Sequence, residues 1–199
     1  MNQQPLYLDK LTTDLLEPVS LQVKPGEIAC LSGPSGSGKS RLLRAIADLD
    51  PHEGSVRLGD YTQAKVPAHH WRRMVMLVPA ESAWWFDTVG EHMYTPQSAT
   101  LQELGLEPEV MEWPVDRLSS GEKQRLALVR AVSCEPAALL LDEPTANLDP
   151  DTTRLVEHWL TGYIREREIP AFWVAHDSEQ IERVGDQHLH IAGGRLEGH

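Results

Sequence analysis

The chain has 199 residues, of which 18 are Lys or Arg and 30 are Asp or Glu, giving a formal net charge of −12. Phosphate backbones select basic surfaces, so we expect no nucleic-acid partner. No apolar run approaches the roughly 18 residues that span a bilayer, so any membrane work would fall to a separate protein. The two cysteines, Cys30 and Cys134, lie in apolar segments and are expected to be buried free thiols in a reducing compartment.

The amino-terminal part predicts several strands. Residues 6–32 alternate between apolar and polar with a turn at 24–26, and residues 55–59 form another short strand. Residues 27–32 indicate a buried strand that enters a glycine-rich loop, and residues 41–47 follow that loop with helical spacing. Strand, glycine loop and helix therefore occur in the order that a phosphate-binding loop requires.

That loop is Gly33-Pro34-Ser35-Gly36-Ser37-Gly38-Lys39-Ser40, which matches the pattern G-x-x-x-x-G-K-[ST]. Glycines lack a Cβ, so successive N–H groups can turn toward an anion at the start of a helix. Lys39 is expected to reach the β- and γ-phosphates, and the Ser40 hydroxyl to take one position on Mg²⁺. Average residue usage gives a chance match in roughly one chain of this length in a hundred. The loop therefore predicts a nucleoside triphosphate site.

A second chemical feature follows the apolar run 138–141, which predicts a strand buried on both faces of a parallel sheet. The run delivers Asp142 and Glu143 at its carboxyl end, where open α/β sheets bind ligands. Asp142 is expected to hold Mg²⁺ through its water shell, and Glu143 to polarise the attacking water as general base. Without the glycine loop, an ordinary acidic strand end would be the simpler interpretation.

The remaining elements complete an α/β pattern. Residues 86–118 contain three prolines between short helical patches and predict a small helical lobe, after which a periodic helix begins near Ser119. Asp149 and Pro150 are a cap and a first-turn residue for the next helix. A second apolar run, 171–175, predicts a strand that ends at His176 beside the first.

Together these motifs resemble the nucleotide-binding subunit of ATP-binding cassette (ABC) transporters, of the small single-cassette bacterial type, over essentially the whole chain. Many nucleotidases have the phosphate loop alone, and the signature segment separates this family from them. The matching features run in the family's order: the loop 33–40, the signature segment 118–125, the strand that ends in Asp142 and Glu143, the D-loop 146–149, and the switch residue His176.

The resemblance implies an α/β P-loop NTPase core with a mainly parallel sheet flanked by helices, an antiparallel β-subdomain and a short helical subdomain. Residues 1–199 would form one nucleotide-binding domain, with the core at about 1–79 and 126–199 and the helical lobe at about 86–125. It also implies an ATPase that drives a separate membrane-spanning permease from the cytoplasm, as a peripheral protein on the inner face of the cell membrane.

In this family two cassettes meet head to tail, and each ATP with its Mg²⁺ lies between the loop of one subunit and the signature helix of the other. The resemblance therefore implies a homodimer on ATP binding. Ser119 and Gly121 would contact the γ-phosphate from the opposite subunit, and Asp149 would pass between the subunits. His176 would bond the γ-phosphate and help to fix Glu143 and the water.

The chain departs from the family pattern in several places. Family members usually carry a Gln that touches Mg²⁺ or the lytic water, and here Ala80 takes that position without a polar side chain. The adjacent Glu81 would point to the other face of a strand, so we do not expect it to substitute. The change bears on coupling and turnover rate, not on nucleotide binding. Ser120 and Glu122 replace the usual Gly and Gln of the signature, and both replacements suit contacts made mainly by the amino end of the helix.

No aromatic residue is well placed to stack on adenine, because Tyr7 lies on a strand too early and residues 10–12 occupy the expected turn. Weak adenine discrimination is the expected consequence. The run Trp84-Trp85-Phe86 falls where the family's cassettes receive the permease. We interpret Trp84 and Trp85 as partner contacts, with packing of the lobe against the core as an equally weighted alternative.

Two histidine pairs are interpreted as ordinary residues and not as metal ligands. Residues 69–70, and His188 with His190, lack the further Cys or carboxylate neighbours that a zinc site needs. Two other functions stay open beside the transporter ATPase. One is a soluble cassette protein acting in DNA repair or on ribosomes, although the long coiled-coil insertion or second cassette usual there is missing. The other is a regulatory nucleotide-binding module with little turnover, which Ala80 suggests.

Overall fold

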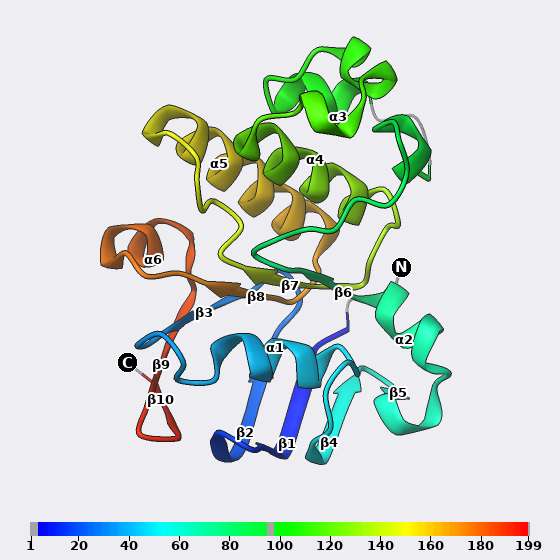
Figure 1. The fold of residues 1–199 in the computed structure, drawn as a ribbon. Helices are drawn as coiled ribbons and strands as arrows, with labels where there is room; N and C mark the ends of the chain where they lie inside the picture. Colours follow the sequence, from blue (N-terminus) through cyan, green and yellow to red (C-terminus); the bar gives the residue numbers. More distant parts are fainter. Residues whose placement is uncertain (1–3, 95–97, 199) are drawn as a thin grey trace.

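Two β-sheets form the frame of the molecule (Figure 1). The computed structural model describes residues 4–94 and 98–198. The first sheet is antiparallel, with its four strands in the order β2-β1-β4-β5. Its strands β1 (Leu6–Thr13) and β2 (Leu16–Val23) lie within the predicted range 6–32, and β4 (Glu53–Leu58) overlaps the predicted strand at 55–59. The short β5 (Tyr61–Thr62) was not predicted.

The second sheet has six strands in the order β10-β9-β3-β8-β7-β6, and only β10 runs antiparallel to its neighbour. All residues of β3, β7 and β8 are buried, which explains their uninterrupted apolar runs. The strands are β3 (Ile28–Ser32), β6 (Val75–Val78), β7 (Ala138–Asp142), β8 (Ala171–Val174), β9 (Gln187–Ala192) and β10 (Arg195–Gly198).

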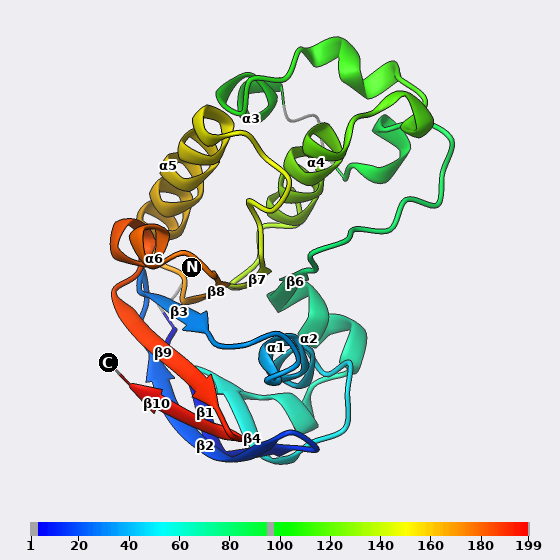
Figure 2. The same cartoon turned by 60° about the vertical axis from the view of Figure 1, so that its left-hand side comes forward.

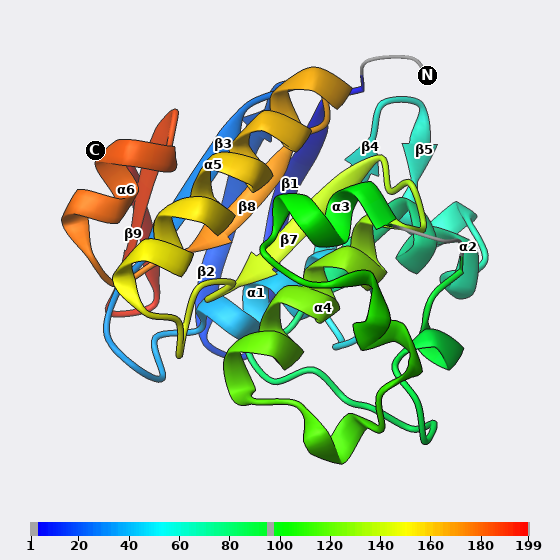
Figure 3. The same ribbon diagram turned by 90° about the horizontal axis from the view of Figure 1, so that it is seen from above.

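Helices cover both faces of the six-stranded sheet (Figures 1 and 3). The helix α1 (Lys39–Ile46) lies between the two sheets, whereas α4 (Ser120–Val132) and α5 (Pro150–Arg167) cover the opposite face. The shorter helices are α2 (Ala68–Met74), α3 (Ser98–Glu103) and α6 (Ser178–Val184), with single 3₁₀ turns at η1 (Gln63–Lys65), η2 (Gly90–His92), η3 (Pro108–Glu112) and η4 (Val115–Arg117).

Alternate residues of the central strands feed two apolar clusters. On β7, Leu139 and Leu141 pack toward α4 and α5, while Leu140 packs toward α1 and the antiparallel sheet. Trp173 and Phe172 of β8 divide in the same way, and both are fully buried. Burying an aromatic side chain of this size contributes about 3 kcal/mol. The clusters fix the position of the strand ends that carry the polar residues.

The chain from β6 to α4 forms the predicted short helical lobe, which projects beyond the sheet and carries α3 (Figure 2). The mainly parallel sheet, the antiparallel sheet and this lobe confirm the predicted α/β architecture. Among the described helices, none combines the length and the apolar character needed to cross a membrane. Both cysteines are free; Cys30 is buried, whereas Cys134 is only half-buried, which corrects the prediction for that residue. Burial raises the pKa of the Cys30 thiol to about 12.

Candidate functional site

Three neighbouring strands deliver the predicted site residues to one edge of the sheet. The strand β3 pairs with β8, and β8 pairs with β7, all in parallel, so their carboxyl ends lie together. The phosphate loop 33–40 follows β3, Asp142 ends β7 and is followed by Glu143, and His176 follows β8. Residues more than a hundred positions apart in sequence therefore share one site.

The phosphate loop has the backbone that anion binding requires. Gly33, Gly36 and Gly38 have φ values of 138°, 76° and 109°, and Gly38 is the amino-terminal cap of α1. The buried Lys39 donates from Nζ to the carbonyl oxygens of Gly33 (2.8 Å) and Pro34 (3.0 Å), so its charge lies across the loop. In the described part of the chain the buried Ser37 hydroxyl has no hydrogen-bond partner.

These features fit a bound triphosphate. Left-handed glycines and a helix amino terminus present N–H groups and partial positive charge, and a bound phosphate would satisfy the Ser37 hydroxyl. The ammonium group of Lys39 lies against the backbone of Gly33 and adds a full positive charge to this anion-binding loop.

Asp142 and Ser40 provide the oxygen ligands that Mg²⁺ prefers. Burial raises the pKa of Asp142, the charge of Glu143 adds to that effect, and a hydrogen bond with Ser40 together with the charges of Lys39 and His176 opposes it. A divalent cation would favour the ionised carboxylate. A hydroxyl and a carboxylate in hydrogen-bonding contact therefore fit an octahedral Mg²⁺ that keeps most of its waters.

Glu143 and His176 are in direct side-chain contact. The distance from His176 Nε2 to Glu143 Oε1 is 2.6 Å, and the two side chains are 52% and 35% exposed, respectively. Glu143 also has a φ of 52°, a left-handed conformation that costs a non-glycine residue on the order of 1–2 kcal/mol. A carboxylate that is partly open to solvent, hydrogen-bonded to an imidazole and carried on a strained backbone position suits a general base whose orientation must be fixed.

The signature segment caps α4. Ser119 donates to Glu122 Oε2 from its backbone N–H (2.8 Å) and from its hydroxyl (2.7 Å), and Glu122 N–H donates back to Ser119 Oγ (3.2 Å). These hydrogen bonds lower the pKa of Glu122. A Cβ on Gly121 would lie 3.3 Å from Leu148 Cδ2, so the start of α4 packs on the segment 146–149. In the described residues no hydrogen bond joins Ser119 or Gly121 to the phosphate loop.

Asp149 is the amino-terminal cap of α5, as predicted. Its Oδ1 accepts from the N–H groups of Asp151 (3.1 Å) and Thr152 (3.0 Å), and the hydrogen bonds with Thr152 hold its pKa below the ordinary value. Pro150 occupies the first turn. Within one subunit this carboxylate is therefore committed to the helix end.

The glutamine position of the family takes a different form from the one predicted. The strand β6 ends at Val78, so Ala80 and the exposed Glu81 lie in a bend beyond it. Alternation along a strand therefore says nothing about where Glu81 points, and that argument was wrong. Ala80 is half-buried and brings no polar atom of its side chain to the site.

The turn predicted at residues 10–12 is also wrong, because β1 continues through them to Thr13. Lys10 adopts a φ of 49°, and the register with β2 and β4 shifts near it, so an irregular strand interior resembles a turn in sequence. The β1–β2 turn is at Asp14 and Leu15. A Cβ on Gly38 would lie 3.3 Å from Leu15 Cβ, so the side chain beside the phosphate loop is aliphatic.

The aromatic run divides into a packed and an exposed part. Trp84 is half-buried against the core, whereas Trp85 and Phe86 are 63% and 47% exposed. His92 Nε2 accepts hydrogen bonds from the N–H groups of Trp85 (2.9 Å) and Phe86 (3.0 Å). Arg130 of α4 donates to the carbonyl oxygen just before this run (2.9 Å), and its guanidinium lies 4.7 Å and 5.0 Å from the two indole rings.

Sequence reasoning did not anticipate either His92 or Arg130 here. The two histidines of β9 also gain a structural role, because Ser32 Oγ bonds to His188 Nε2 (2.7 Å) and to His190 Nδ1 (2.8 Å).

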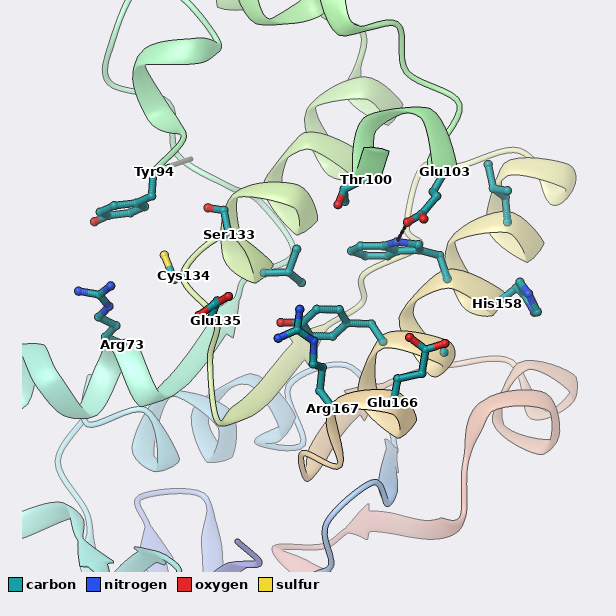
Figure 4. Close-up of a pocket in the computed structure, with 15 residues that line it drawn as sticks. Arg73, Tyr94, Thr100, Glu103, Ser133, Cys134, Glu135, His158, Glu166 and Arg167 are labelled. Atoms are coloured by element: carbon teal, nitrogen blue, oxygen red, sulfur yellow. Dashed lines mark hydrogen bonds between the residues drawn. The ribbon is translucent and has the colours of Figure 1, made fainter. Parts of the chain in front are cut away.

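A large cavity lies away from this edge of the sheet. It has a volume of about 840 Å³ and lies between α3, α5 and the end of α4, with Tyr94 and Arg73 among the residues that line it (Figure 4). Trp159 on its wall donates to Glu103 (2.9 Å). None of the predicted nucleotide-binding residues is among those that line it.

The chain is similar to known proteins along most of its length. Residues 16–146 match the family described as "ABC transporter". The phosphate import ATP-binding protein PstB of Aeropyrum pernix is 34% identical over 92% of this chain and 82% of its own length. Protein STAR1 of Oryza sativa subsp. japonica is 35% identical, and the sulfate/thiosulfate import ATP-binding protein CysA 2 of Shewanella oneidensis is 33% identical. The chain covers 57% and 56% of those two relatives.

The fold is shared with a solved structure of a bacterial Atm1-family ABC exporter with ATP bound. The TM-score is 0.86 at 24% sequence identity, over 98% of this chain and 38% of the exporter chain. A fold match over nearly the whole chain, relatives above 30% identity and a family match that includes the phosphate loop, the signature segment and Glu143 lead to one conclusion. The chain belongs to the ABC transporter family, as an ATP-binding subunit.

Proposed function

We propose that the chain hydrolyses ATP at a site shared by two copies arranged head to tail, and that this hydrolysis drives a separate membrane permease from the cytoplasmic face. The observation that carries the proposal is the 2.6 Å contact between His176 and Glu143 at the edge of the sheet that also holds the phosphate loop. A base, its orienting partner and a phosphate cradle are the parts that phosphoryl transfer to water requires.

Each residue has a role that its surroundings support. The phosphate loop and Lys39 bind and neutralise the β- and γ-phosphates, while Ser40 and Asp142 would hold Mg²⁺, which neutralises charge on the phosphates when it is bound. Glu143 accepts the proton of the attacking water. His176 holds the carboxylate in one orientation and is exposed enough to reach the γ-phosphate as well.

The shared site follows from what one subunit lacks. In the part of the chain that the structure describes, Ser119 and Gly121 make no hydrogen bond to their own phosphate loop, yet they lie at the amino end of a 13-residue helix, which favours anions. A second copy would bring that helix end to the γ-phosphate. Ser119 would then exchange its hydrogen bond to Glu122 for one to phosphate.

We further propose that Trp85 and Phe86 are the contact with the permease, and that Trp84 holds the patch on the core. Exposed aromatic residues are frequent anchors of protein interfaces. Arg130 connects this patch to α4, whose other end carries Ser119. A partner that displaces the patch would therefore act on the helix that completes the ATP site.

Steady-state ATP hydrolysis by the purified chain, measured with Mg²⁺ against protein concentration, tests the proposal. We expect the rate per subunit to rise with concentration, because each site needs two copies. Ala80→Gln is expected to change the rate by less than tenfold, because Glu143 and its partner His176 are already in contact without it. No turnover by the parent and strong turnover by Ala80→Gln would instead favour the regulatory module with little turnover.

Glu122→Gln is expected to strengthen ATP-dependent dimerisation several-fold. Gln keeps the reciprocal cap with Ser119. The lowered pKa of Glu122 means that its side chain carries a negative charge, and Gln removes this charge from the helix end that meets the γ-phosphate. Analytical ultracentrifugation with ATP, in a background that cannot hydrolyse it, would measure the effect. Glu179→Gln on the exposed face of α6 is the matched control. Unchanged or weaker dimerisation would contradict this placement of the signature helix.

A further inference from the structure

One buried amide joins the two segments that carry Glu143 and His176. Gln180 lies in the first turns of α6, is 8% exposed, and uses both hydrogens of its side-chain amide. Its Nε2 donates to Thr145 Oγ1 (2.8 Å) and to Glu157 Oε1 (2.8 Å). Thr145 follows the general base by two residues, and Gln180 follows the switch histidine by four.

The acceptor on α5 is itself firmly held. Glu157 is 4% exposed, and Arg183 donates to both of its carboxylate oxygens, from Nε and from a terminal nitrogen, each at 2.9 Å. Burial alone would raise the pKa of Glu157, but the hydrogen bonds from Arg183 and Gln180 outweigh it and hold that pKa below the ordinary value. Gln180 is therefore fixed from one side by an anchored carboxylate and can hold Thr145 on the other.

Other hydrogen bonds also hold the segment that carries the base, since the buried Gln124 donates to the carbonyl oxygen of Pro144 (3.2 Å) and Ala146 N–H donates to that of Glu143 (3.0 Å), but neither reaches the segment that carries His176. In the described residues, two side-chain hydrogen bonds join the segment 143–149 to the segment 175–184. One is the contact between Glu143 and His176, which is open to water, and the other is the bond between Gln180 and Thr145. Glu143 is also in a left-handed conformation, which persists only where its surroundings hold it.

We propose that Gln180 is a positioning residue for ATP hydrolysis, which sets the orientation of Glu143 toward His176 by holding Thr145. The inference rests on the proposed function of this site. Among the described residues no hydrogen bond joins Gln180 or Thr145 to the phosphate loop, so their loss is expected to slow the chemical step and to leave nucleotide binding intact.

The test compares Thr145→Val, which keeps the shape and removes the hydroxyl, with Thr145→Ser, which keeps the hydroxyl. We expect Thr145→Val and Gln180→Met each to lower kcat about tenfold with KM for ATP within about twofold of the parent, and Thr145→Ser to retain most of the parent kcat. Because the two residues act through one bond, the double variant Thr145→Val with Gln180→Met is expected to be no slower than Thr145→Val alone.

Thr161→Val is the matched control, because within residues 4–94 and 98–198 the Thr161 hydroxyl bonds only to carbonyls of its own helix α5 (2.8 Å and 3.0 Å). Its kcat is expected to equal that of the parent. If Gln180→Met does not fold, the comparison of Thr145→Val with Thr145→Ser still tests the inference. A kcat of Thr145→Val within twofold of the parent, or an equal loss in Thr145→Ser, would overturn the inference. If the parent does not hydrolyse ATP, or if Glu143→Gln hydrolyses it at the parent rate, the proposed function fails instead.

Discussion

Replacing Glu143 with Gln is expected to lower kcat for ATP hydrolysis by about 10²- to 10⁴-fold, because a general base is removed. In the parent, His176 Nε2 lies 2.6 Å from a carboxylate oxygen of Glu143. Gln has nearly the same shape and can keep this hydrogen bond, but it cannot accept a proton from water. The phosphate loop is unchanged, so ATP affinity is expected to stay within about threefold of the parent. Bound but uncleaved ATP would then hold the two copies together.

The measurement combines turnover assays with size-exclusion chromatography in ATP. Glu81→Gln is the matched control, because it makes the same chemical change at an exposed glutamate beside Ala80, the position where the family's usual glutamine is missing. If Glu81→Gln lost activity and Glu143→Gln kept it, the base would have been assigned to the wrong carboxylate. Loss in both variants would show that Glu81 supplies part of what the missing glutamine does elsewhere.

Local sequence patterns predicted the parts of the site whose chemistry is carried by neighbouring residues. A few neighbouring residues are enough to predict the loop 33–40, the strand before Asp142 and the cap at Asp149. Glycine freedom, burial on two faces and helix capping each depend on residues that are close in sequence. The position of His176 beside Glu143 followed from the expectation that two buried strands are neighbours, and β7 and β8 do pair.

Other parts depend on residues that are distant in sequence, and no local pattern carries them. Gln180 looks like a surface residue of a short helix, yet its partners lie 35 and 23 positions away and bury it. The aromatic run could not be divided into packed and exposed rings without Arg130, which lies more than forty positions downstream. The prediction of a turn near Lys10 failed for a related reason, since a left-handed residue within a strand has the local appearance of a turn.

Gly33→Ala is the second substitution with a large expected effect, and it acts on stability as well as on binding. A Cβ at Gly33 would lie 2.3 Å from the carbonyl oxygen of Ile191, a backbone atom of β9 that cannot rotate away, and φ is 138°. We expect a loss of about 3 kcal/mol or more in the free energy of unfolding, because both strain and overlap must be relieved by moving the loop or the strand.

Gly36→Ala separates these two causes. Gly36 also has a positive φ, 76°, but a Cβ there would meet nothing within 4 Å, so only the conformational cost of about 1–2 kcal/mol applies. Urea unfolding of both variants and of the parent gives the difference directly. A larger loss for Gly33→Ala would mean that β9 is the wall that shapes the phosphate loop, and ATP affinity should then fall in parallel. Equal losses would assign the whole effect to backbone conformation and leave β9 without that role.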